Sequence, residues 1–235
     1  MPADSTAIAV WAVVAGGLAA LGPLVIRRLP EPILESDAAD KIPYHELGRR
    51  PGLWWKLGTA GAAAGAAIGW RLDYDPIVWA WVYLAAVGVV LGYIDSQTRL
   101  LPTRLIVPSY VIVTVLVVAA SAADDFVRDD LIRAALGLIV MGGFYRLMYA
   151  IYPAGMGFGD VRLSGVLGIA LGYIGWGALL TGMYAGFLLG GVGGGLLAVF
   201  RVADRRRYPF GPFMLLGALV GLLWGQAIGY WYSSF

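Results

Sequence analysis

The chain has 235 residues, of which 60% are hydrophobic and only 14% are charged. Because a soluble domain carries about 25% charged residues, this composition excludes an ordinary soluble protein and indicates a polytopic membrane protein. No cysteine is present, which excludes a disulfide framework, a thiol nucleophile and a zinc site made of cysteines. The lipid bilayer is therefore the expected surrounding, and nucleic acid is not an expected partner.

Uncharged runs follow one another along most of the chain, and a helix needs about 20 apolar residues to cross a bilayer core. The runs are too long for barrel strands and do not alternate apolar with polar residues. We therefore predict an all-α polytopic bundle of about eight membrane-spanning helices. In chain order they are residues 5–26, 57–70, 76–94, 105–123, 131–152, two helices within 163–200 that turn at 172–177, and 208–235.

Two of these spans are less regular than the others. The run at 57–70 is short for a span, and it relies on Trp54, Trp55 and Trp70 as interfacial anchors. The run at 131–152 is interrupted by Arg146. Both are counted among the eight predicted spans.

The distribution of charge predicts how the helices are oriented. Basic residues gather in the loops between the first and second, third and fourth, and seventh and eighth spans, whereas the intervening loops are acidic. Basic loops stay in the cytosol, so both termini are expected outside. Residues 1–56 are expected to form a retained first helix and a short cytosolic loop, because the basic pair follows the apolar run. Residues 57–235 are expected to form the rest of the bundle.

Glycine accounts for 34 residues, and its spacing bears on how the helices pack. Gly61, Gly65 and Gly69 recur every fourth residue, which places them on one face of a helix. Small residues at this spacing let two membrane helices approach closely. We expect this face to be a contact between helices.

Two aspartates lie at the edges of apolar runs: Asp95 ends the third predicted span and Asp160 precedes the sixth. Both ends face the cytosol in the predicted topology. A carboxylate costs upward of ~2.5 kcal/mol at a bilayer centre, so each one needs a reason. Paired carboxylates can activate water: one accepts its proton while the other, protonated, polarises a scissile carbonyl. Two close carboxylates divide the roles in this way because both cannot ionise cheaply.

Both aspartates also have structural interpretations. Asp is a favoured N-cap, so Asp160 could simply begin a helix. Asp95 could be a boundary residue that pairs with Arg99, four positions later. The residue types alone leave these interpretations open.

Three stretches around these residues carry more specific patterns. They are residues 93–108, in which Asp95 is followed by Pro102 and Pro108; residues 155–163, Gly-Met-Gly-Phe-Gly-Asp-Val-Arg-Leu; and residues 208–213, Tyr-Pro-Phe-Gly-Pro-Phe. Together with Val-Ile-Arg-Arg-Leu-Pro at residues 25–30, they resemble, in the same order along the chain, the type IV prepilin peptidase family. Members of that family are membrane aspartic proteases of the GxGD type.

The resemblance implies that Asp95 and Asp160 are the catalytic pair of an aspartyl endopeptidase, which needs no metal and no cofactor for proteolysis. Family members remove the short basic leader from prepilins and pseudopilins at the cytosolic side of the bacterial cytoplasmic (inner) membrane. They cut just before the hydrophobic segment that later forms the pilus core. Such substrates are the expected partners, and the oligomeric state is left open. The residues expected to bind substrate or shape the active site are Gly155, Gly157, Gly159, Arg162, Pro102, Pro209, Gly211 and Pro212.

The sequence departs from the family pattern in three places. Thr103 stands where an acidic residue often follows the proline, and Arg162 stands where a lysine is usual, which keeps the charge but not its geometry. Many bacterial members carry zinc-binding CxxC motifs in the first cytosolic loop, associated with methylation of the new N-terminus by S-adenosylmethionine. The corresponding loop, residues 27–56, has no cysteine. S-adenosylmethionine is therefore an expected cofactor only if a methyltransferase activity is retained.

Two other functions stay open from the sequence. An ion- or proton-coupled transporter or channel can also place carboxylates beside broken helices. A catalytically inactive homologue could serve as an assembly scaffold. The Pro-Phe-Gly-Pro segment at residues 209–212 argues against the transporter, and the presence of both carboxylates argues against the scaffold.

Overall fold

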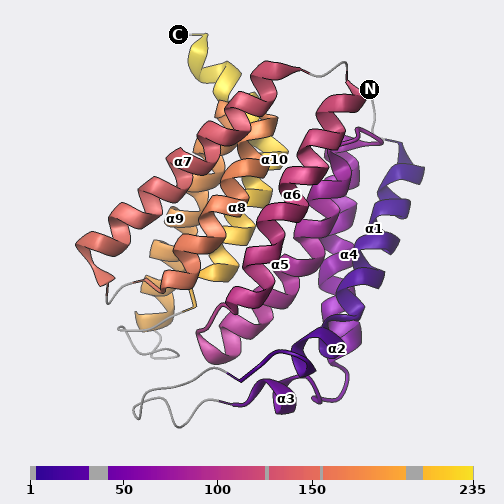
Figure 1. The fold of residues 1–235 in the computed structure, drawn as a ribbon, viewed down its shortest axis with the longest axis vertical. Helices are drawn as coiled ribbons and strands as arrows, with labels where there is room; N and C mark the ends of the chain where they lie inside the picture. Colours follow the sequence, from indigo (N-terminus) through magenta and orange to yellow (C-terminus); the bar gives the residue numbers. More distant parts are fainter. Residues whose placement is uncertain (1–3, 32–41, 125–126, 154–155, 200–208, 235) are drawn as a thin grey trace.

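The computed structural model describes residues 4–31, 42–124, 127–153, 156–199 and 209–234, and these ranges fold into helices with no strand among them (Figure 1). The predicted all-α class is therefore confirmed. The helices are α1 (Ser5–Ala20), α2 (Gly22–Arg27), α3 (Tyr44–Leu47), α4 (Leu53–Leu72), α5 (Val78–Thr98), α6 (Thr103–Ala123), α7 (Arg128–Ile151), α8 (Phe158–Ile174), α9 (Trp176–Val199) and α10 (Gly211–Ser233).

The uncharged runs locate the long helices, but several helices extend past the charges that bounded the runs. α4 begins at Leu53, before Lys56. The helix can contain this charge because the Lys56 side chain is exposed, with its ammonium 5.7 Å from the centre of the Trp55 ring. α5 continues to Thr98, so Asp95 lies inside its last turn and not after it. The turn predicted within residues 163–200 is confirmed at Gly175, which separates α8 from α9 and has a φ angle of 150°.

Five stretches of the described chain are long and apolar enough to cross a membrane: Ser5–Arg27, Val78–Thr98, Thr103–Ala123, Arg128–Ile151 and Gly211–Trp231. The chain is therefore built as a membrane protein. The remaining long helices, α4, α8 and α9, pack among these five. A total of eight crossings, both termini outside and the division of the chain at residue 56 stay predictions.

The helices pack most extensively in three pairs, α1 with α4, α7 with α8 and α9 with α10. The glycine face of α4 contacts α1, as predicted: a Cβ atom on Gly61 would lie only 2.8 Å from the carbonyl oxygen of Ala15. α7 and α8 approach equally closely. A Cβ atom on Gly168 or Gly137 would lie less than 3.0 Å from the carbonyl oxygen of the other glycine. Backbone contact through small residues is the usual way that membrane helices associate.

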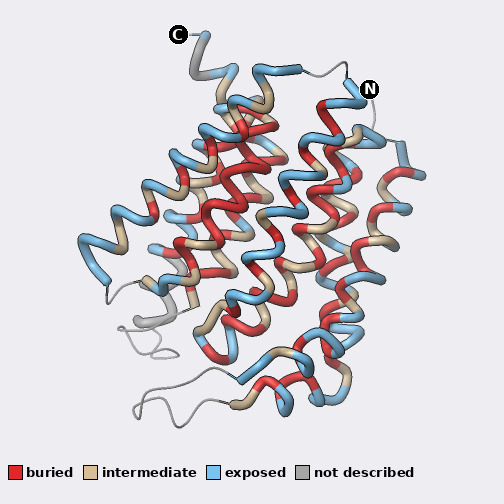
Figure 2. The backbone as a smooth tube through the Cα atoms, in the orientation of Figure 1, coloured by how far each residue is buried: buried red, intermediate tan, exposed pale blue. Residues whose placement is uncertain are grey.

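α5 and α8 lie in the middle of the bundle. In α5, 61% of the most apolar stretch is buried, against at most 33% in the other four apolar helices. α8 is enclosed in the same way, since residues 163–173 are all buried (Figure 2). The C-terminal end of α5 and the N-terminal end of α8 lie at the same end of the bundle, opposite the start of α1 and the end of α10 (Figure 1). The two candidate aspartates are therefore carried to one end by the two most enclosed helices.

The segment containing α2 and α3 lies at this same end, beneath α5 (Figure 1). Ile26 and Tyr44 form one buried cluster with Ile94, the residue before Asp95. Glu31 stabilises the segment because its carboxylate accepts the backbone N–H groups of Tyr44 (2.9 Å) and His45 (3.0 Å). Burial acts to raise the pKa of Glu31, but these N–H groups outweigh it and hold the pKa below its usual value. The carboxylate is therefore ionised at neutral pH.

Candidate active site

Asp95 lies in the last turn of α5 with only 4% of its surface exposed. Its Oδ2 atom accepts a hydrogen bond of 2.9 Å from the backbone N–H of Gly211, the first residue of α10. A Cβ atom on Gly211 would lie 3.0 Å from that same oxygen, so a side chain there would crowd the carboxylate. The Pro-Phe-Gly-Pro segment thus reaches Asp95 from a distant part of the sequence.

Asp160 lies in the first turn of α8 and is 5% exposed. Its Oδ2 atom accepts a hydrogen bond of 3.0 Å from the N–H of Gly157, the residue before the helix. Asp160 is therefore not the N-cap that the structural interpretation predicts: the N-cap is Gly157, and Asp160 supports the start of α8 as its third residue. The other oxygen, Oδ1, is buried and has no hydrogen-bond partner among the described residues. Because an unpaired buried acceptor is costly, Oδ1 is the atom of this carboxylate that is available to a substrate or a water molecule.

The two carboxylates converge at this end of the bundle. Asp95 in the last turn of α5 and Asp160 in the first turn of α8 lie at the same end of the molecule, and both are buried (Figure 1). Leu101, in the connection between α5 and α6, lies beside both of them. A Cβ atom on Gly159 would lie 2.6 Å from Cβ of Leu101, and a Cβ atom on Gly211 would lie 3.4 Å from its Cδ1. The glycine next to each carboxylate therefore packs on the same leucine, which the sequence analysis did not single out.

The described contacts of Arg162 tie α8 to the start of α6. Its Nη1 atom donates a hydrogen bond of 2.5 Å to Oγ1 of Thr103, and its guanidinium lies 4.7 Å from the centre of the Phe158 ring. The Tyr110 hydroxyl, also on α6, donates to the backbone oxygen of Arg162 at 2.6 Å. Two of the departures from the family pattern, Thr103 and Arg162, thus contact each other and hold the two helices together.

The other predicted site residues surround these helix ends. Pro102 is buried and precedes α6. Pro209 and Pro212 flank the Phe210-Gly211 pair where α10 begins, and both are half-buried. Gly155 lies outside the described residues.

Arg99, the alternative partner of Asp95, lies where α5 ends and has a φ angle of 57°. Its backbone N–H donates to the backbone oxygen of Asp95 at 2.7 Å. No ion pair joins the two side chains within the described ranges. Asp95 is thus held by the Gly211 amide and not by the predicted surface ion pair.

Tyr145 of α7 is a further polar residue at this site that the sequence analysis missed. Its side chain is fully buried, its hydroxyl has no hydrogen-bond partner in the described part of the chain, and the charge of Asp160 acts on it. Its ring lies 6.0 Å from the ring of Phe210, the residue before Gly211. The only signal in the sequence is a tyrosine within an apolar run, which is weak because aromatic residues are common in membrane helices.

Comparisons with known proteins agree on one family. Residues 82–199 match the type IV leader peptidase family. The prepilin leader peptidase/N-methyltransferase of Aeromonas salmonicida (strain A449) is 31% identical over 161 residues, which are 66% of this chain and 54% of that protein. Proteins of the same name from Stutzerimonas stutzeri and Bacillus subtilis (strain 168) are each 26% identical, over 72% and 71% of this chain and 57% and 62% of their own length. No solved structure matches the chain significantly.

The chain spans little more than half the length of the curated relatives it matches. The matched residues 82–199 nevertheless make up half of this chain, and they contain both Asp95 and Asp160. The glycine-flanked aspartate of α8 and the aspartate of α5 therefore lie within the region that defines the family. On this match, the chain belongs to the type IV leader peptidase family.

Proposed function

We propose that this protein is a membrane aspartyl endopeptidase that removes the leader peptide from prepilin or pseudopilin substrates at the cytosolic face of a bacterial cytoplasmic membrane. The observation that supports it most is the convergence of Asp95 and Asp160, two buried carboxylates from different helices, at one end of the bundle. Membership of the type IV leader peptidase family and the names of the relatives agree with this activity.

The chemistry follows from what two neighbouring carboxyl groups can do to a water molecule. The ionised carboxylate takes a proton from water as the water oxygen attacks the scissile carbonyl, and the protonated carboxyl donates to the carbonyl oxygen. Asp160 Oδ1 is the acceptor without a described partner, whereas Asp95 Oδ2 is already bonded to Gly211. When the tetrahedral intermediate collapses, the C–N bond breaks and the amine takes up the proton that came from water. The other carboxylate accepts the proton of one hydroxyl of the intermediate as the new carboxyl carbonyl forms, so the pair again holds one proton.

The distribution of charge supports a cytosolic active site. Among the described residues, basic side chains outnumber acidic ones at the end of the bundle that carries the two aspartates, and acidic side chains outnumber basic ones at the other end. Because basic loops stay in the cytosol, the aspartates would face that compartment. The described arginines and lysines at their end are Arg27, Arg28, Arg49, Arg50, Lys56, Arg99, Arg104, Arg146 and Arg162, while the arginines at residues 201–207 lie outside the described ranges.

The proposal is tested by incubating the purified full chain with a candidate prepilin and sequencing the N-terminus of the product. We expect a new N-terminus just before the hydrophobic segment of the substrate. The mass of the product, measured with S-adenosylmethionine present, reports methylation separately. Absence of any processing, together with ion flux in proteoliposomes, would overturn the proposal in favour of a transporter.

S-adenosylmethionine stays an expected cofactor only if a methyltransferase activity is retained. No step of the proposed proteolysis depends on that cofactor.

Tyr145→Phe tests whether the buried hydroxyl acts on the reaction. An unpaired buried hydroxyl costs about 1–3 kcal/mol, so its removal is expected to leave the thermal stability unchanged or raised. If the hydroxyl donates to the reacting carboxylate only during catalysis, the cleavage rate is expected to fall by roughly 10- to 100-fold, because a hydrogen bond to a charged group contributes about 1.5–3 kcal/mol. Melting temperature and kcat are measured on the same preparation. An unchanged kcat would mean that Tyr145 only fills space beside Asp160.

A further inference from the structure

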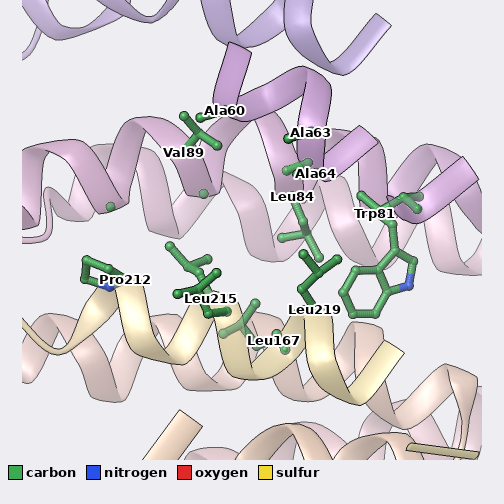
Figure 3. A pocket seen from close by; sticks show the side chains of 16 residues that line it. Ala60, Ala63, Ala64, Trp81, Leu84, Val89, Leu167, Pro212, Leu215 and Leu219 are labelled. Atoms are coloured by element: carbon green, nitrogen blue, oxygen red, sulfur yellow. The ribbon is translucent and has the colours of Figure 1, made fainter. Parts of the chain in front are cut away.

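A groove with a volume of about 450 Å³ runs between α4, α5 and α10 (Figure 3). Its lining is predominantly apolar: alanines from α4, leucines from α10, and small and aliphatic residues together with Trp81 from α5. Two of the lining alanines, Ala60 and Ala63, are exposed, so the described part of the chain leaves this wall open. In a membrane protein such an opening faces hydrocarbon and not water.

One end of the groove lies beside the candidate catalytic pair. Pro212 lines that end and directly follows Gly211, whose N–H is bonded to Asp95. Gly92 lines the same end from α5 and precedes Asp95 by about one helical turn. Trp81 lies at the opposite end (Figure 3). The groove is therefore continuous with the site and leads away from it along the bundle.

The dimensions and the lining suit a helix. Between Gly92 and Trp81, α5 advances by roughly 16 Å at ~1.5 Å per residue, which equals about three turns. Alanines on α4 and glycines on α5, among them Gly88, form the shallow side. Because hydrocarbon already solvates apolar surface in a membrane, close packing on small residues is what favours a helix over lipid chains.

We infer that this groove docks the apolar helix of the substrate, the segment that follows the scissile bond, and thereby aligns that bond with Asp95 and Asp160. The inference rests on the proposed function. About three turns of helix seated between Trp81 and Pro212 place the residues just before the helix beside Gly211 and Asp95. The leader then extends from the groove toward the aqueous face, and the apolar helix stays at membrane depth.

The absence of native cysteine allows a site-directed crosslinking test. Ala60→Cys and Ala64→Cys are each combined with Asp160→Asn, to keep the substrate uncut, and with prepilins carrying single cysteines along the apolar helix. A short thiol crosslinker is expected to join both positions to the substrate. Since the two alanines are one helical turn apart, the preferred substrate position should shift by about four residues between them. Val111→Cys, on an exposed face of α6 outside the groove, is the matched control and should not crosslink.

A variant that fills the groove with a larger side chain gives an independent test through KM and kcat. Ala63→Phe is expected to raise KM for a full prepilin roughly tenfold with little change in kcat, because it removes binding and not chemistry. Ala119→Phe, on the exposed face of α6, is the control.

If the unmodified protein cleaves prepilin but the groove cysteines crosslink no better than Val111→Cys, the groove holds lipid. The inference about the groove is then wrong, while the proposed peptidase activity stands. If the unmodified protein does not cleave, both proposals are overturned together.

Discussion

Asp95→Asn and Asp160→Asn are each expected to abolish removal of the leader from a prepilin reporter. Each change takes away a group that must either accept the proton of water or donate one to the carbonyl oxygen, so kcat should fall by at least roughly 10²–10⁴-fold. Asparagine keeps the shape of aspartate and an oxygen that can accept the N–H of Gly211 or Gly157. Both variants should therefore insert and fold normally. Cleavage is followed by the change in reporter size and by N-terminal sequencing.

The matched control is Asp129→Asn, an exposed carboxylate in the first turn of α7, at the other end of the bundle. It should cleave at the rate of the unchanged protein. Substantial cleavage by either site variant would remove that aspartate from the mechanism. A loss of activity in all three variants would instead indicate that activity depends on the net charge of the protein and not on the two site carboxylates.

Gly168→Ala is expected to have the second-largest effect, on both stability and activity. Its new Cβ atom would meet the backbone of Gly137 in α7 and lie 3.1 Å from Cβ of Met141. Backbone cannot move aside as a flexible side chain can, so overpacking of this kind should cost about 1–3 kcal/mol. α7 carries Tyr145 and α8 carries Asp160. Separating the two helices should therefore lower the melting temperature and the cleavage rate together.

Gly143→Ala is the control for this prediction, because a Cβ atom there would have nothing within 4 Å. It should leave activity unchanged and stability equal or slightly higher, since alanine is about 0.5–1 kcal/mol better than glycine inside a helix. Melting in a mild detergent and the initial rate of cleavage are measured for both variants. A Gly168→Ala protein that melts and cleaves like the unchanged chain would contradict the packing described between α7 and α8.

Patterns local in the sequence predict much of the fold. The fourfold spacing of Gly61, Gly65 and Gly69 predicts the close contact of α4 with its neighbour, because helical periodicity alone puts them on one face. Helix ends are less predictable. Lys56 ended a predicted run and yet lies within α4, and Arg146 interrupts a predicted run without breaking α7. Long cationic side chains reach aromatic rings or the interface, so such charges need not end a helix. The Arg146 guanidinium, for example, lies 5.4 Å from the centre of the Phe158 ring.

The candidate site could be predicted only in part. The two aspartates stand out because a carboxylate beside an apolar run needs an explanation. Leu101 and Tyr145 do not stand out, because a leucine or a tyrosine in such a chain is ordinary. What makes them relevant is the register of α7 and α8 and the path of the connection after α5. That register depends on backbone contacts between helices far apart in sequence, which no single segment specifies.

The hydrogen bond from Gly211 to Asp95 joins an early part of the chain to its last described helix. A polypeptide emerging from the ribosome would insert α5 and α8, and so both carboxylates, well before residue 211 is synthesised. During that interval Asp95 has no amide donor and the groove lacks its α10 wall. The complete site can therefore form only after α10 has been synthesised and has packed against α5.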